Sequence, residues 1–86
     1  MDATMISQNK LSKEYQLSYN GRSVLITLRI IRHRPEIQVD AVNYGSGYKK
    51  SFSEFGNLQQ FLYHFLGTTF QGSRKEFIES LFFGKI

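Results

Sequence analysis

Two stretches on either side of Asn20-Gly21 alternate between hydrophobic and polar residues, KEYQLSY before the dipeptide and RSVLITLRII after it. Alternation with a period of two is typical of strands that bury one face. Asn-Gly is the preferred centre of a two-residue hairpin turn, because both positions need a positive φ. Such a turn fixes the register and places Leu17 opposite Val24. The sequence therefore predicts an antiparallel hairpin.

The two faces of this hairpin differ in character. The face expected to pack in the core carries Leu11, Tyr15, Leu17, Val24, Ile26, Leu28 and Ile30. The other face is mixed and carries Glu14, Gln16, Ser18, Leu25, Thr27, Arg29 and Ile31. An antiparallel sheet with one buried face and one solvated face produces this pattern.

Two more strands are expected after the hairpin. Pro35 cannot donate to a sheet ladder and marks a turn, so the third strand covers residues 36–44. The glycines of Gly45-Ser46-Gly47 mark the next turn, and a fourth strand follows over residues 48–53.

The charges suggest a register for these strands. Placing Arg29 opposite Asp40 makes an opposite-charge pair across the ladder, which is mildly favourable. In that register Leu28 meets Ala41 on the core face, and a short turn then brings Phe52 beside Ala41.

The spacing of hydrophobic residues changes to that of a helix in the last third of the chain. The first stripe comprises Leu58, Phe61, Leu62, Phe65 and Leu66. Asn57 is a suitable N-cap for this helix, with Ser53 as an alternative start, and Gly67 is a suitable end.

A second helix is expected to begin at Ser73, which forms a capping box with Glu76. Its hydrophobic stripe is Phe77, Ile78 and Leu81. Gly84 is placed to end it.

The predicted fold is therefore α+β, a four-stranded antiparallel meander followed by two C-terminal helices packed on one sheet face, in the order ββββαα. Residues 1–10 are polar and lack periodicity, so we expect a flexible N-terminal tail. Residues 11–86 are expected to form a single domain, with the second sheet face open to solvent.

Composition narrows the function classes. The 86 residues contain no cysteine, which excludes disulfides and thiolate metal sites. The formal net charge is +4 at pH 7, which suits an acidic partner. No apolar run approaches the ~20 residues of a membrane span, and the N-terminus lacks the features of a secretory signal. We expect a cytoplasmic protein that does not bind membranes.

Catalytic chemistry is not indicated. The two histidines, His33 and His64, are predicted to lie apart, and two histidines alone do not make a metal site. The GSGYKKS segment lacks the glycine spacing of a phosphate-binding loop and precedes a strand rather than a helix. We expect no enzyme activity, cofactor, metal ion or small-molecule substrate.

The leading hypothesis is a protein-interaction module, adaptor-like or inhibitor-like, that binds a partner or forms a homodimer. Several hydrophobic side chains on an open sheet face indicate a covered surface, and an exposed aromatic residue on the second helix would add a contact. The candidate partner-binding residues are Leu25, Ile31, Val42, Tyr44 and Phe83. The open sheet face, the edge strand and the C-terminal helix are all candidate surfaces.

The alternative is a domain that binds single-stranded DNA or RNA. Basic side chains would contact phosphates, and a tyrosine on the open face would stack on a base. The candidate residues are Arg29, Arg32, Arg34, Tyr44, Lys49 and Lys50. Lysines on an edge strand also serve to block aggregation between sheets, so both interpretations remain open.

Overall fold

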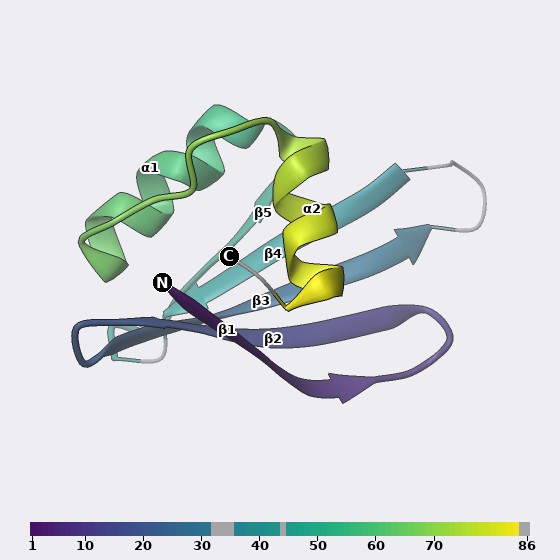
Figure 1. The fold of residues 1–86 in the computed structure, drawn as a ribbon, viewed down its shortest axis with the longest axis horizontal. Helices are drawn as coiled ribbons and strands as arrows, with labels where there is room; N and C mark the ends of the chain where they lie inside the picture. Colours follow the sequence, from purple (N-terminus) through teal and green to yellow (C-terminus); the bar gives the residue numbers. More distant parts are fainter. Residues whose placement is uncertain (32–35, 44, 85–86) are drawn as a thin grey trace.

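The computed structural model describes residues 1–31, 36–43 and 45–84, and it shows a five-stranded antiparallel sheet with two helices on one face (Figure 1). The elements are β1 (Asp2–Gln8), β2 (Ser12–Tyr19), β3 (Arg22–Ile31), β4 (Glu36–Asn43), β5 (Tyr48–Phe52), α1 (Phe55–Leu66) and α2 (Arg74–Phe83). The strands lie in sequence order, so β1 and β5 are the two edges. The predicted α+β meander with two C-terminal helices is confirmed, with one more strand than expected.

The additional strand is at the N-terminus. Residues 2–8 form β1 rather than the expected flexible tail, and they pair with β2 from Asp2 opposite Ser18 to Gln8 opposite Lys13. Most of β1 is exposed, which explains why its sequence shows no alternation. Backbone pairing along β2 orders this segment.

The turn between β1 and β2 accounts for a second correction. Asn9 Oδ1 accepts hydrogen bonds from the backbone N–H groups of Leu11 at 2.8 Å and Ser12 at 2.9 Å. Because β2 begins at Ser12, Leu11 belongs to this turn and is exposed rather than part of the core.

The central hairpin forms as predicted. Asn20 and Gly21 have φ angles of 50° and 76°, and Leu17 pairs with Val24. The positive φ at both positions is the reason that Asn-Gly occupies this turn.

The registers of β4 and β5 differ from the expected ones by two residues. Leu28 pairs with Val39 rather than Ala41, and Phe52 also pairs with Val39. A shift of two leaves each side chain on its predicted face. The turn containing Pro35 lies outside the described residues.

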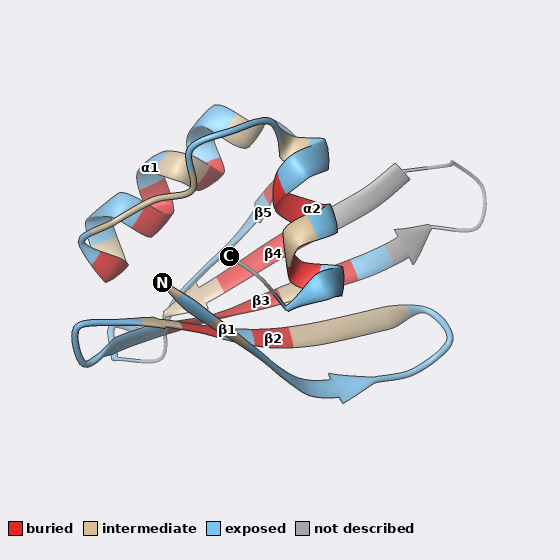
Figure 2. Ribbon diagram, viewed as in Figure 1, coloured by how far each residue is buried: buried red, intermediate tan, exposed pale blue. Residues whose placement is uncertain are grey.

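The core lies between the sheet and the two helices, as the buried segments in Figure 2 show. It contains Tyr15, Leu17, Val24, Ile26, Leu28, Val39, Ala41, Phe52, Leu58, Phe61, Leu62, Leu66, Phe77, Ile78 and Leu81. Five of the seven residues of the predicted core face of the hairpin therefore meet the stripes of both helices, with Phe65 only partly buried. The exceptions are Leu11, which is exposed, and Ile30, whose side chain lies outside the described residues.

The helix ends are partly as expected. For α2 the capping box is present, with Glu76 N donating to Ser73 Oγ at 3.1 Å. Gly67 closes α1 with φ 81°, but the N-cap is Glu54, three residues before the predicted Asn57 and one residue after the alternative start at Ser53. Glu54 has an extended conformation and makes no side-chain cap.

Candidate functional site

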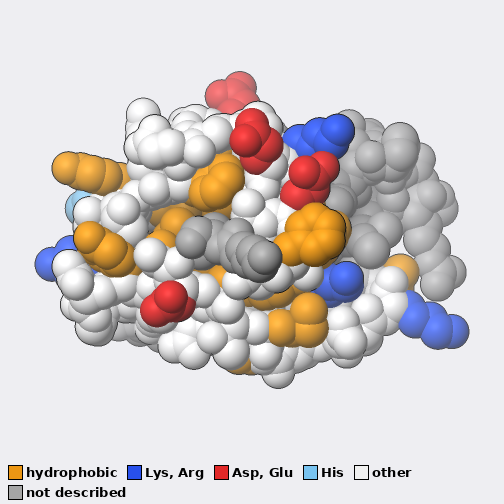
Figure 3. Space-filling view, viewed as in Figure 1, with side chains coloured by type: hydrophobic (Ala, Val, Ile, Leu, Met, Phe, Trp, Pro, Cys, Tyr) orange, Lys and Arg blue, Asp and Glu red, His pale blue; other side chains and the backbone are white. Residues whose placement is uncertain are grey.

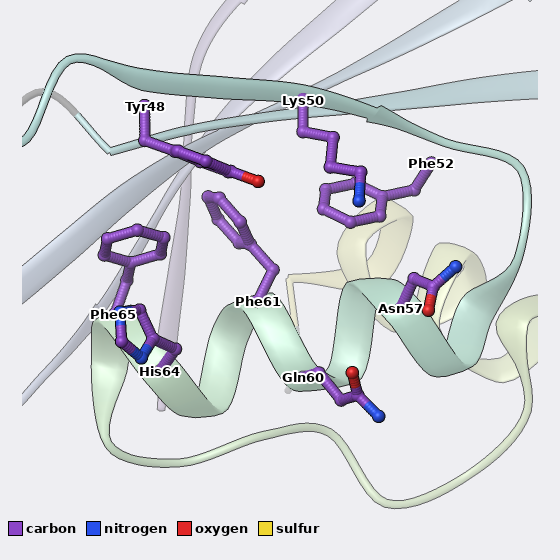
Figure 4. A pocket seen from close by; sticks show the side chains of 8 residues that line it. All are labelled: Tyr48, Lys50, Phe52, Asn57, Gln60, Phe61, His64 and Phe65. Atoms are coloured by element: carbon purple, nitrogen blue, oxygen red, sulfur yellow. The ribbon is translucent and has the colours of Figure 1, made fainter.

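A groove runs between edge strand β5 and helix α1, with a volume of about 340 Å³ (Figure 4). Three of its lining residues come from β5 and five from one flank of α1. They are Tyr48, Lys50, Phe52, Asn57, Gln60, Phe61, His64 and Phe65.

The local sequence explains this lining. Side chains alternate along a strand, so Tyr48, Lys50 and Phe52 all project from β5 toward α1 (Figure 4). On a helix, residues three and four apart share one face, and the spacing of Asn57, Gln60 and His64 therefore places polar side chains along one flank of the groove.

Aromatic rings form the apolar part of the groove. The Tyr48 ring lies 5.8 Å from that of Phe61 and 5.5 Å from that of Phe65, measured between centroids. Tyr48 is nevertheless 46% exposed. Solvent therefore reaches an aromatic cluster whose other members pack against the core.

The charges at the groove are basic. Lys50 Nζ lies 5.6 Å from the centroid of the Phe52 ring, and Lys49 is the next residue on the opposite side of β5, facing the open sheet surface. The exposed His64 packs edge-on against Phe65, with a centroid distance of 4.7 Å. The groove thus combines apolar rings with the ammonium group of Lys50, and Lys49 adds a second ammonium group on the opposite face of the same strand.

The backbone of β5 is a further part of this site. It pairs with β4 along one side, and its other side is an edge of the sheet. Edge strands present backbone N–H and C=O groups that another strand can pair with.

The described residues of the open sheet face offer less apolar surface than expected. Leu25 is only 9% exposed, so the expectation that it faces solvent is wrong. It lies between Gln16 and Val42 in the register, and cross-strand neighbours cover a side chain in the middle of a sheet. Val42 is partly buried. The side chain of Ile31 and all of Tyr44 lie outside the described residues.

A polar network occupies another part of this face. Arg29 Nε lies 3.2 Å from Asp40 Oδ2, although the register places Gln38 opposite Arg29 and makes the ion pair diagonal. Ser51 Oγ donates a short hydrogen bond to Asp40. The Asp40 carboxylate is buried in this network. The positive charge of Arg29 and the hydroxyl group of Ser51 offset its lost hydration.

Phe83 is 76% exposed at the end of α2. With Glu76, Glu79 and Ser80 it borders a shallow depression of about 480 Å³. Acidic and hydrophobic side chains lie next to each other over α2 in Figure 3. This surface is separate from the β5–α1 groove.

The basic residues predicted to bind nucleic acid are not gathered on one described surface. Lys49 and Lys50 project from opposite sides of β5, and Arg29 is paired with Asp40. Arg32, Arg34 and Tyr44 lie outside the described residues.

Tyr15 is the buried titratable group of the core. Its hydroxyl has no hydrogen-bond partner among the described residues, and burial raises the pKa of this phenol. Tyr15 belongs to the buried core and lies on β2, which is three strands away from β5 in the sheet.

In the described part of the chain, no three His, Asp or Glu side chains lie close enough together to hold a metal ion. Neither described helix is long and apolar enough to span a bilayer.

Sequence reasoning missed the groove because it assigned Phe61 and Phe65 to the core alone. Phe61 is indeed buried, but Phe65 is only partly buried. A usable signal was the polar flank at Asn57, Gln60 and His64 next to this stripe. Comparison with protein-family models, curated proteins and solved structures found no match to this chain.

Proposed function

We propose that this protein is a non-catalytic interaction module that binds an extended, acidic segment of a partner protein as an additional strand on β5, beside α1. The observation that carries the proposal is the aromatic groove along the free edge of β5. In this mode of recognition, backbone hydrogen bonds supply affinity and side-chain pockets supply specificity.

The groove suits this mode because its two walls have different roles. The edge of β5 offers backbone groups to a new strand. The exposed ring of Tyr48, with Phe61 and Phe65 behind it, offers apolar contact to side chains of that strand that point toward α1.

Charge favours an acidic partner over a second copy of this chain. Two β5 edges brought together would oppose the lysines at positions 49 and 50 of each copy, and like charges across a ladder are destabilising. An acidic segment would turn the same lysines into favourable contacts.

The test is a titration of the protein with a short blocked peptide that contains two aspartates and a phenylalanine among threonine and valine. Amide exchange measured by NMR should show new protection in β5 and shifted signals from Phe61 and Phe65. A matched control peptide carries N-methyl groups at alternate residues, on the edge that would face β5, and should lose binding. Methylation of the other edge should be tolerated. Equal binding by both methylated peptides would contradict strand addition.

Single-stranded nucleic acid is the competing outcome. Fluorescence polarisation with labelled single-stranded DNA and RNA at two salt concentrations measures it directly, because phosphate contacts weaken steeply with salt. Micromolar binding of these strands by the parent, lost in Lys49→Glu and Lys50→Glu, would overturn the proposal if the acidic peptide does not bind.

A further inference from the structure

We infer that the β5–α1 groove selects segments in which two consecutive acidic residues are followed directly by an apolar residue. This inference rests on the proposed function and specifies the ligand of that same site. It follows from the order of three neighbouring residues of β5, Tyr48, Lys49 and Lys50.

The two lysines require consecutive carboxylates. Lys50 projects toward α1 (Figure 4), and Lys49 projects to the open face because adjacent strand residues alternate. A strand added beside β5 alternates in the same way. Its residue opposite Lys50 therefore points toward α1, and the next residue, opposite Lys49, points to the open face. Two acidic residues separated by one position would both lie on the same face and could neutralise only one of the lysines.

The apolar position follows from Tyr48. The ligand residue opposite Tyr48 points toward α1 and meets an exposed ring that contacts Phe61 at 5.8 Å and Phe65 at 5.5 Å between centroids. An aromatic or large aliphatic side chain there extends the cluster and removes its exposed surface from water.

The direction of the ligand decides the order. All four strand pairs of the sheet are antiparallel, and antiparallel pairing is slightly more stable per residue than parallel pairing. A ligand antiparallel to β5 passes Lys50 first, then Lys49, then Tyr48. Read from its N-terminus, the segment is acidic, acidic, apolar.

The test uses four blocked peptides with the same flanking residues. Three contain two aspartates and one phenylalanine, in the orders Asp-Asp-Phe, Phe-Asp-Asp and Asp-Phe-Asp, and the fourth contains Asn-Asn-Phe. Dissociation constants are measured by calorimetry at low salt. Exposed ion pairs are individually weak, so we expect Asp-Asp-Phe to bind about 3- to 10-fold more tightly than each of the others.

Charge reversal locates the contacts. Lys49→Glu should weaken the binding of the Asp-Asp-Phe peptide by about 3-fold. A peptide with lysine in place of the second aspartate should recover the lost affinity for this variant. Lys10→Glu is the matched control, because Lys10 is exposed in the turn between β1 and β2, on the opposite side of the sheet from β5. It carries the same change of charge and should leave the order of affinities unchanged.

The outcomes separate the inference from the proposed function. If the three isomeric peptides bind equally well and protect the β5 amides, strand addition stands and the order inferred here is wrong. If Phe-Asp-Asp binds best, the ligand runs parallel to β5 and the inferred order is also wrong. If none binds and no β5 amide is protected, both fail.

Discussion

The two edges of the sheet, β1 and β5, are protected in different ways. Strand β1 carries exposed Met5 and Ile6, and its register with β2 shifts between Met5 and Ser7. Strand β5 has a continuous register with β4 and carries two lysines. A shift of register bends a strand and interrupts its ladder, whereas charge repels like edges and leaves the backbone regular.

Under the proposed function, this difference favours β5 over β1 as the edge that binds a partner. An irregular edge disfavours pairing with any added strand, because its backbone N–H and C=O groups do not have the regular spacing of a ladder. A regular, charged edge discourages only strands of the same charge. The groove beside α1 would add side-chain contacts to a strand on β5, which supports the proposal of selective pairing at this edge.

The largest expected effect comes from removing a side chain that packs α1 against β5. Phe61 is buried and contacts the rings of Phe52, Phe65 and Tyr48. Phe61→Ala should lower the free energy of unfolding by about 3–5 kcal/mol in a urea titration, because it leaves a cavity. Phe83→Ala, at an exposed position, is the control and should change it by less than about 0.5 kcal/mol. A Phe61→Ala protein as stable as the parent would show that α1 does not pack on β5 as described.

Removing β1 tests the other edge. Deletion of residues 1–8 should cost about 1–3 kcal/mol in the same titration, because the strand loses its ladder and the partly buried Met1 and Ala3 leave the core. Peptide binding at β5 should be unchanged, since β1 lies on the far side of the sheet. A dissociation constant that rises in proportion to the lost stability would contradict the separation of the two edges.

Neutral residues at the two lysine positions should allow the β5 edges of two copies to associate. Lys49→Thr combined with Lys50→Thr removes the repulsion and raises strand propensity. Light scattering should then show self-association at high protein concentration. Met5→Thr combined with Ile6→Thr is the matched change on β1 and should show none. If both double variants associate, or neither does, then the two edges are not protected from association in the different ways described above.

The smallest effect concerns Tyr15, which lies on β2 opposite Met5 of β1. Tyr15→Phe removes a buried hydroxyl that has no partner among the described residues, so stability at neutral pH should be unchanged or rise by up to about 1 kcal/mol.

Alkaline pH should enlarge that difference. Burial raises the pKa of Tyr15 in the folded state above the usual tyrosine value of about 10. The unfolded state therefore releases its proton first, and the stability contributed by the neutral phenol is lost as the pH rises above about 10. The parent should lose stability faster than Tyr15→Phe in this range. Parallel curves in urea titrations from pH 9 to 11 would show that Tyr15 is not buried as described.

Local chemistry made much of the fold predictable. Asn20-Gly21 sets its hairpin through backbone φ angles, and Ser73 and Glu76 cap α2 through their own side chains. The registers of β4 and β5 were not predictable to the residue, because a shift of two keeps the hydrophobic pattern intact. Strand β1 gave no pattern because few of its side chains reach the core.

The candidate site was harder to predict than the fold. The edge strand and its lysines were recognisable, but the groove depends on how far α1 lies from β5, and hydrophobic spacing does not encode that separation. The stripe containing Phe61 and Phe65 therefore pointed only to the core. Leu25 illustrates the converse, since a position on the open face is buried by its cross-strand neighbours.

The sequential order of the strands also shapes how the chain acquires its structure. Each strand pairs with the one made just before it, so loop closures are short, and chains dominated by such local pairings fold quickly. The helices that cover the apolar face of the sheet follow the strands in the chain. A nascent chain can therefore assemble its strands while the apolar face is still exposed to solvent. Intermediates with exposed hydrophobic surface are prone to aggregate. Synthesis of α1 and α2 is the step that ends this exposure.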